Sequence, residues 1–410
     1  MKILFRNIHL YLGLIAGMIF FTECLSGTLL VFEDEITQFL HHDRYYVKQV
    51  EKNQLPADEL ITLLQQKMPE ARVKTVKIYQ DPTRTAELSW GERRGGGKAN
   101  DKRSKANPQK SRANIGAPKS DKPKFDMAYV DPYTGEVMEM LNGREPTFFT
   151  VVLNIHQSLL AGEVGKSVIG ISTFVVFFIL ITGIILWWPK NRKMLPARLK
   201  VKTGAGWKRV NHDLHIVMGF YCTFFILLFL LTSLAWSFQW ANKALYTLTS
   251  SSMKMPKAPL SLPDAENRKV KFETALQEGR RQFPTSIYLS VNMPEKKDST
   301  AAISVSAVSN YPLHNNGFDN LYIDQHSGAV LGKTFYKDMS KGWQLRRYMK
   351  PLHTGSIGGL STKIIAFLAA LINASFPITG VILWINRLRK SKGRKRTAPV
   401  RDKRLTSLPV

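Results

Sequence analysis

The chain has 410 residues, with 58 Lys and Arg against 31 Asp and Glu and a net charge of +27. Such a balance would suit nucleic acid, but four apolar runs are each long enough to cross a bilayer core of about 30 Å, which takes about 20 helical residues. A soluble nucleic-acid-binding protein is therefore excluded, and we expect a membrane-embedded α-helical protein whose first partner is the lipid bilayer. The four expected transmembrane helices cover residues 8–32, 167–188, 214–238 and 364–385.

The first apolar run follows Lys2 and Arg6, a basic start that a cleaved signal peptide also has. Its apolar part is longer than a signal core of about 7 to 15 residues, and no A-x-A-like cleavage site follows it. We therefore expect a retained helix. Within it, Glu23 is an ionisable residue at a depth where a charge is costly, and its role is left open. Cys24, like Cys222 in the third run, is expected to be a buried free thiol.

The exported part of the first half contains a basic, low-complexity stretch at residues 91–124, with almost no apolar side chains. A segment of this composition cannot bury enough apolar surface to fold by itself, so we expect a disordered insertion. Attraction of this stretch to anionic lipid or to an acidic partner is the alternative.

Around this insertion the exported segments resemble each other in pattern. Residues 56–67 and 271–282 have helical spacing of their apolar positions, and each is followed by short β-rich runs. A shared D-x-x-x-G stands at Asp131 to Gly135 and at Asp324 to Gly328. It suits a turn between paired strands, where Asp bonds its own backbone and Gly accepts a positive φ. We expect two small α+β domains.

An internal repeat extends through the whole chain. IHLYLG at 8–13 matches LHIVMG at 214–219, NIHQSLLAGEVGK at 154–166 matches PLHTGSIGGLSTK at 351–363, and ITGIILW at 181–187 matches ITGVILW at 378–384. Such self-similarity predicts a tandem duplication. Two halves that run in the same direction should be related by a pseudo-twofold axis along the membrane normal.

Lysine and arginine bias predicts the orientation, because short positively charged loops stay on the cytoplasmic side. The basic loop at 189–211 and the basic tail therefore face the cytoplasm with both termini. The predicted segments are transmembrane helix 1 at 1–33, a first exported domain at 34–145 that includes the insertion, an interfacial histidine segment with helix 2 at 146–188, the basic loop at 189–211, helix 3 at 212–238, a second exported domain at 239–337, a second histidine segment with helix 4 at 338–386, and the tail at 387–410.

Four of the nine histidines are paired by the repeat and fall at two depths. His9 and His215 begin helices one and three on the cytoplasmic side, whereas His156 and His353 precede helices two and four on the other side. Two neutral imidazoles that face each other across an axis are the ligands that a low-spin haem iron requires. We therefore predict haem iron ligands in all four. Glycines near each histidine would give a flat porphyrin room: Gly13, Gly17, Gly162, Gly165, Gly219, Gly358 and Gly359.

Several alternatives stay open. A single His at a helix end is usually an interfacial polar residue, and small residues in membrane helices usually serve helix packing. A histidine-bound copper or zinc would lack nearby carboxylate or thiolate ligands. His212, one turn before His215, has no repeat partner, and it is the alternative ligand on the third helix.

These motifs together resemble a known family, the bacterial PepSY-associated transmembrane helix proteins, also described as iron-regulated membrane proteins. The likeness rests on H-x-x-x-G at His9 and His215, the D-x-x-x-G turns, IHQSLLAG, LHTGSIGG and the ITG-x-x-LW ends. It implies a bacterial inner (plasma) membrane protein with PepSY-like periplasmic domains. Members are linked to siderophore uptake, and some look like dihaem b-type reductases of ferric siderophores.

We therefore expect two haem b groups, electron transfer from the cytoplasmic side, and reduction of a periplasmic ferric siderophore with release of Fe(II). No Rossmann, flavin or Fe–S motif is present, so the electron donor is separate: quinol, a flavin or another reductase. Trp343, Arg346, Arg347 and Tyr348 are suited to attract an anionic chelate or to anchor the chain at the lipid headgroups. The alternative functions are a haem-free accessory or binding protein of siderophore uptake or peptidase regulation, and a transporter.

Overall fold

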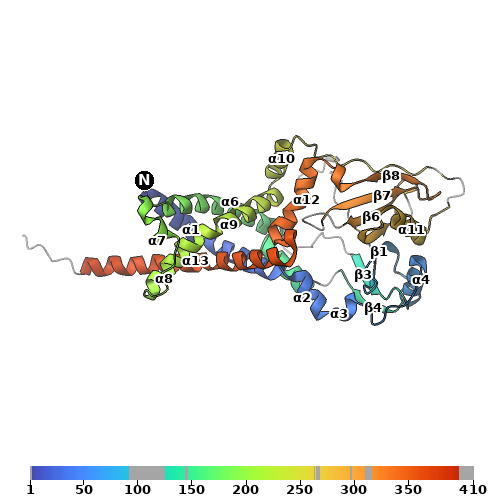
Figure 1. Ribbon diagram of the computed structural model, residues 1–410, viewed down its shortest axis with the longest axis horizontal. Coiled ribbons are helices and arrows are strands. Elements are labelled where there is room, and N and C mark those ends of the chain that lie inside the picture. The colour runs from blue at the N-terminus through green and yellow to red at the C-terminus, as the bar shows by residue number, and fades with distance from the viewer. Residues whose placement is uncertain are drawn as a thin grey trace, which may run out of the picture.

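The structure is a computed structural model that describes residues 2–91, 125–143, 146–262, 264, 268–295, 298–309 and 316–396. A bundle of long helices stands at one end and a β-sheet at the other (Figure 1). Except for Gly91, the predicted insertion at 91–124 lies outside the described residues, and so does the part of the tail that follows Arg396.

Four helices of the described chain are long and apolar enough to cross a membrane: Lys2–Leu30, Gly162–Trp187, Trp207–Ser237 and Ser356–Arg389. They comprise α1 (Lys2–Leu30), α6 (Gly162–Trp187), α8 (Trp207–Asp213) continued by the π-helical turn η2 (Leu214–Met218) and α9 (Gly219–Ser237), and η4 (Ser356–Gly358) continued by α13 (Gly359–Arg396). The prediction of four membrane-crossing helices is confirmed, and the chain is a multi-pass membrane protein.

Shorter helices flank the bundle. On the side of the sheet are α2 (Glu33–Leu40), α3 (His42–Tyr45), α5 (Phe148–Ser158), α10 (Gln239–Leu248), η3 (Tyr336–Asp338) and α12 (Lys341–Thr354). At the opposite end are η1 (Arg192–Met194) and α7 (Leu195–Arg198), close to the N-terminus and to the last turns of α13 (Figure 1). The basic segments therefore gather at one end of the bundle, as the predicted topology requires; which side of the membrane that end faces stays a prediction.

The two segments that were expected to be exported form one sheet. Its strands are β1 (Val73–Tyr79), β2 (Ala86–Gly91), β3 (Phe125–Val130), β4 (Val137–Leu141), β5 (Ser286–Asn292), β6 (Ile303–Ser309), β7 (Phe318–Ile323) and β8 (Val330–Thr334). Their order is β4-β3-β2-β1-β5-β6-β7-β8, all antiparallel. Two separate domains were expected, but β1 and β5 pair at the centre, with Lys77 opposite Ser290.

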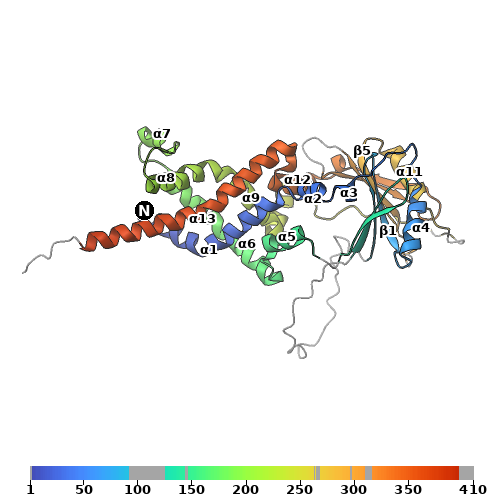
Figure 2. The same ribbon diagram turned by 90° about the horizontal axis from the view of Figure 1, so that it is seen from below.

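One hydrophobic core serves both halves of the sheet. The helices α4 (Ala57–Lys67) and α11 (Phe272–Gln282) cover the face that is turned away from the bundle (Figure 2). Alternation along the strands sends every second side chain to these helices, and the fully buried residues include Leu60, Leu64, Val76, Leu88, Leu276, Val291, Val305 and Leu321. The two halves therefore cannot be separated without opening this core.

The two covering helices also cap each other. The Asp58 carboxylate accepts hydrogen bonds from the backbone N–H groups of Phe272 (3.1 Å) and Glu273 (2.9 Å), and the Glu273 carboxylate accepts from the N–H of Ala57 (2.9 Å). The first N–H groups of a helix have no acceptor within the helix, so each helix start is satisfied by an acid from the other half.

Both D-x-x-x-G turns have the predicted geometry. Asp131 Oδ1 accepts from the N–H of Tyr133 at 2.8 Å, and Asp324 Oδ1 accepts from the N–H of His326 at 2.9 Å. The closing glycines have φ values of +73° at Gly135 and +76° at Gly328, a backbone region that a side chain would strain. The turn prediction is confirmed.

Candidate functional site

The four repeated histidines meet in two pairs inside the bundle. The ring centroids of His9 and His215 are 6.3 Å apart, and those of His156 and His353 are 6.1 Å apart. Two metal–nitrogen bonds of about 2 Å in line, with about 1 Å more from each nitrogen to its ring centre, give a separation of about 6 Å. Each pair is therefore spaced so that one metal ion would fit between its imidazoles.

The two pairs lie near opposite ends of the membrane-crossing helices. The first pair includes His9 of α1, and the second pair contacts α1 through the hydrogen bond between His156 and the Glu23 carbonyl. At 1.5 Å per residue, positions 9 and 23 are about 21 Å apart along the helix. Between them is an apolar layer of buried residues: Val176, Cys222, Ile226 and Leu230, with Phe20, Ile372 and Phe376 packed against them. Both sites therefore fit within one bilayer core of about 30 Å.

His212 does not belong to the pair formed by His9 and His215, which we call the inner pair. Its Nδ1 lies 3.2 Å from Asp213 Oδ1, and its side chain is 47% exposed. His215 instead contacts His9, from within the π-helical turn η2. Such turns are rare and are frequent at functional sites. Of the two histidines that the sequence offered on the third helix, the structure thus places His215, and not His212, against His9.

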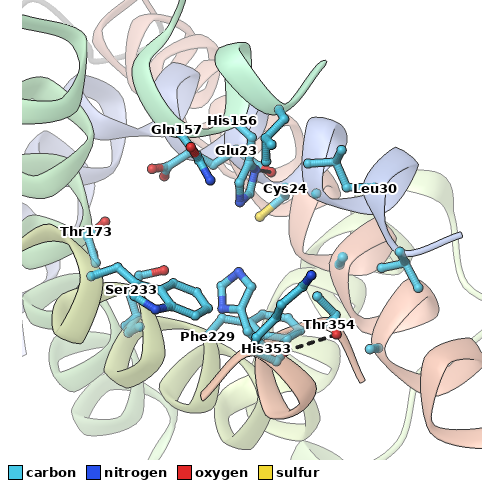
Figure 3. Close-up of a pocket in the computed structure, with 18 of the residues that line it drawn as sticks. Glu23, Cys24, Leu30, His156, Gln157, Thr173, Phe229, Ser233, His353 and Thr354 are labelled. Carbon is cyan, nitrogen blue, oxygen red and sulfur yellow. Dashed lines mark hydrogen bonds between the residues drawn. The ribbon is translucent and has the colours of Figure 1, made fainter. Parts of the chain in front are cut away.

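The pair formed by His156 and His353, which we call the outer pair, occupies a cavity of about 1640 Å³ between the bundle helices. His156 and His353 point toward each other from opposite sides, with Cys24 beside them and Phe229 against His353 (Figure 3). Burial lowers the pKa of both imidazoles, that of His353 to about 3. Both rings are therefore neutral near pH 7, which is the form that binds a metal.

The ring orientation of the inner pair is fixed through Nδ1. In His9 this atom lies 3.0 Å from the Ile179 carbonyl and 3.1 Å from the Thr182 hydroxyl, and in His215 it lies 2.8 Å from the Thr379 hydroxyl. A carbonyl can only accept, and both hydroxyls donate to backbone carbonyls in the preceding turn. The network therefore assigns the proton to Nδ1 and leaves the Nε2 lone pair free.

The outer pair repeats this arrangement. His156 Nδ1 lies 3.0 Å from the Glu23 carbonyl and 3.1 Å from the Ser26 hydroxyl, while His353 Nδ1 lies 2.7 Å from the Thr232 hydroxyl. Ser26 and Thr232 also donate to carbonyls one turn earlier. Metal-binding histidines almost always donate their second ring N–H in this way. Each of the four rings is thus prepared to bind through Nε2.

Sequence analysis missed these hydroxyl partners, although the repeat carried the signal. Thr182 and Thr379 are the threonines of the two ITG motifs, and Ser26 and Thr232 are related by the offset of 206 that relates His9 to His215. In both halves, the helix beside each histidine carries a hydroxyl at the matched position, and this hydroxyl is the acceptor that orients the imidazole ring.

The glycines that face the histidines differ from those predicted. A Cβ on Gly27 would lie 3.2 Å from His156 Cε1, one on Gly183 would lie 3.3 Å from His9 Cε1, and one on Gly380 would lie 3.4 Å from His215 Cε1. A side chain at Gly27 or Gly183 would require the facing ring to move by a few tenths of an ångström, whereas one at Gly380 would meet His215 at an ordinary contact distance. The approach of ring to helix is therefore tightest at Gly27 and Gly183.

The predicted glycines have other surroundings. A Cβ on Gly13, Gly219, Gly162 or Gly359 would meet no atom within 4 Å, whereas Gly17 faces the Pro377 ring at 3.4 Å. Gly165 and Gly358 lie tightly against residues of their own local turns. Gly13 and Gly219 therefore leave open space on the helices that carry the inner pair, but they do not touch the rings.

One polar residue of the cavity wall is unexpected. Asn373 on α13 is fully buried, and neither its Nδ2 nor its Oδ1 has a hydrogen-bond partner among the described residues. An unpaired amide in an apolar interior costs several kcal/mol. The aligned residue of the first half is Val176, so this polar group belongs to one half alone.

The described residues contain no group of three or more His, Cys, Asp or Glu that could hold a metal ion. The candidate ligands that the fold brings together are two pairs of imidazoles. Two axial positions are what a macrocyclic iron leaves for the protein, because the porphyrin supplies the remaining nitrogens. The donor set thus fits haem better than a bare ion, for which structural and catalytic sites use three or four protein ligands.

Comparison with known families assigns the chain. Residues 6–387 match the PepSY-associated TM region, a range that includes both histidine pairs and all eight strands of the sheet. The chain belongs to this family of membrane proteins. Among proteins with curated descriptions, none matches it.

Proposed function

We propose that this PepSY-associated membrane protein is a dihaem b-type reductase of the bacterial inner membrane, which passes electrons from the cytoplasmic side to a periplasmic ferric chelate, most simply a ferric siderophore. The observation that carries the proposal is the repetition of one ligand geometry at two depths: paired imidazoles about 6 Å apart, each held through Nδ1 with Nε2 free.

Three features of the outer site support haem as the bound group. The cavity of about 1640 Å³ surrounds both imidazoles, Gly27 lets His156 approach α1, and Asn373 supplies a polar group that has no partner within the described protein. His156 and His353 would hold one iron, and His9 and His215 the other. Bound at these sites, two haems supply one-electron transfer between the two faces of the membrane.

The remaining roles belong to side chains of the chain itself. Ser26, Thr182, Thr232 and Thr379 hold the imidazoles in the tautomer that binds iron. The apolar layer around Ile226 excludes water between the two sites. At the outer end a chelated Fe(III) accepts one electron and becomes Fe(II), which hard oxygen ligands bind more weakly. A separate donor, a quinol, a flavin or another reductase, supplies that electron on the cytoplasmic side.

The test is the reduced-minus-oxidised absorbance spectrum of the purified full chain, with its haem content. We expect two haems per chain, loss of one in His353→Ala and loss of the other in His215→Ala. His212→Ala is the matched control, because it removes a neighbouring imidazole that faces Asp213, and it should retain both haems. A haem-free wild-type protein would refute the proposal and favour the accessory binding function.

A further inference from the structure

We propose that Arg346 and Arg347 on α12 form the binding site for the anionic oxygen groups of the ferric acceptor, and that Trp236 lies between this site and the outer imidazole pair. The inference rests on the proposed function and identifies where its acceptor binds and which charge that acceptor carries.

The first observation is that the two arginines have no acidic partner. Both guanidinium groups are half-buried, and within the described chain no carboxylate lies within ion-pair distance of either. Their contacts are aromatic: Arg346 Cζ lies 5.7 Å from the Trp236 ring centre, and Arg347 Cζ lies 4.9 Å from that of Phe318. Cation–π contacts leave the planar N–H fork available to an oxyanion. Two adjacent unneutralised cations favour such a ligand.

The second observation is the path to the outer pair. The Trp236 ring lies 5.1 Å from the His353 ring, and Trp236 is one of the residues that line the cavity. Arg346, Trp236 and His353 therefore follow one another in contact. A ligand held by Arg346 is separated from the imidazole by a single aromatic side chain.

The third observation places the arginines at the junction of sheet and bundle. The Asn316 amide donates to the Arg347 carbonyl at 2.9 Å, and Asn316 also lines the cavity. Lys350, one turn after Arg346, lines the same cavity, but it is close enough to Glu33 for a favourable electrostatic interaction with that carboxylate. The arginines, unlike Lys350, face no acid of this kind, so the anion site is assigned to them.

The two halves differ at these positions. Alignment on the outer histidines sets Arg346 opposite Phe149 and Arg347 opposite Thr150. Helix packing or anchoring at the lipid headgroups would be needed in both halves equally. An electron acceptor, in contrast, needs to bind at only one position beside the outer pair. The charge asymmetry therefore agrees with a ligand site on one side of the outer pair.

The experiment uses the full-length protein in detergent, loaded with haem and reduced. Its reoxidation is followed by haem absorbance after mixing with the anionic ferric oxalate complex or with a neutral ferric hydroxamate complex. Arg346→Gln and Arg347→Gln should each slow the reaction with ferric oxalate about tenfold, the value of a charge-assisted hydrogen bond, and the reaction with the neutral complex less than about twofold. Arg346→Lys should recover only part of the loss, because a lysine lacks the fork.

Lys67→Gln is the control, because it removes one exposed positive charge from α4 on the far side of the sheet; it should leave both rates unchanged. Haem content is measured for every variant. Loss of haem in the arginine variants would show that the guanidinium groups bind the propionates of the outer haem instead, and equal slowing with both complexes, or none, would also overturn the inference. A haem-free wild-type protein would reject the proposed function itself.

Discussion

The hydroxyl partners of the histidines give the most discriminating prediction. The Nδ1 atoms of His9 and His156 each have two acceptors, a backbone carbonyl and a hydroxyl, whereas those of His215 and His353 have only the hydroxyl of Thr379 or Thr232 among the described residues. Replacing the hydroxyl by an apolar side chain therefore leaves a buried N–H without an acceptor at His215 and His353 alone.

The expected magnitude follows from that difference. A buried N–H without an acceptor costs about 1 to 3 kcal/mol, so Thr379→Val and Thr232→Val should each weaken haem binding about 10- to 100-fold at one site. Thr182→Val and Ser26→Ala should weaken it less than about fivefold, because the carbonyls of Ile179 and Glu23 remain as acceptors.

Haem titration into haem-free protein, followed by absorbance, measures both sites, and the redox midpoint of each site gives a second readout. All four hydroxyls also bond the preceding turn of their own helix, so the loss of that bond is common to the four variants. Equal weakening in all four, or full affinity in Thr379→Val and Thr232→Val, would refute the assigned roles of Nδ1 and Nε2.

Three further predictions concern other parts of the chain. Asp58→Ala removes the acceptor of two helix-start N–H groups and should lower the free energy of unfolding by about 1 to 2 kcal/mol, measured by thermal unfolding. Desolvation opposes ionisation of Asp324, but hydrogen bonds from three N–H groups outweigh it and lower its pKa to about 2. In the unfolded chain the pKa is about 3.9, so the ionised Asp324 carboxylate stabilises the folded protein by at most about 2 kcal/mol. This contribution is present above pH 4 and is lost as the pH falls toward 2. Asp324→Asn should flatten acid unfolding in that window, and an unchanged profile would contradict the assignment. Asn373→Val should raise the melting temperature of the haem-free protein, because an unpaired buried amide is removed; a lower melting temperature would show that the amide has a partner inside the protein.

The features that sequence reasoning found are those with a local or repeated signal. The apolar runs, the spacing of His9 and His215, and the D-x-x-x-G turns are each readable within a few residues or by comparing the halves. The pairing of β1 with β5 has no such signal, because the register between distant strands depends on which edges meet in three dimensions. Two domains were therefore expected where one sheet exists.

The glycines show a second limit. A glycine next to a histidine in sequence, such as Gly13, lies on the same helix as the ring, whereas the residue that must be small lies on the neighbouring helix that the ring touches, as Gly183 does for His9. Only the packing of α1 against α6 identifies it. Asn373 escaped attention for a similar reason, since a lone amide in an apolar run reveals nothing of its surroundings until the fold buries it.

The central pairing of β1 with β5 has a consequence for any chain of half this length. A chain ending before the third membrane helix would expose the edge of β1, leave Asp58 without the helix that it caps, and carry one imidazole of each couple. Two such chains could restore the sheet and both couples by associating edge to edge. A half-length version of this molecule should therefore function only as a dimer, and joining the halves in one polypeptide removes the dependence of that assembly on protein concentration.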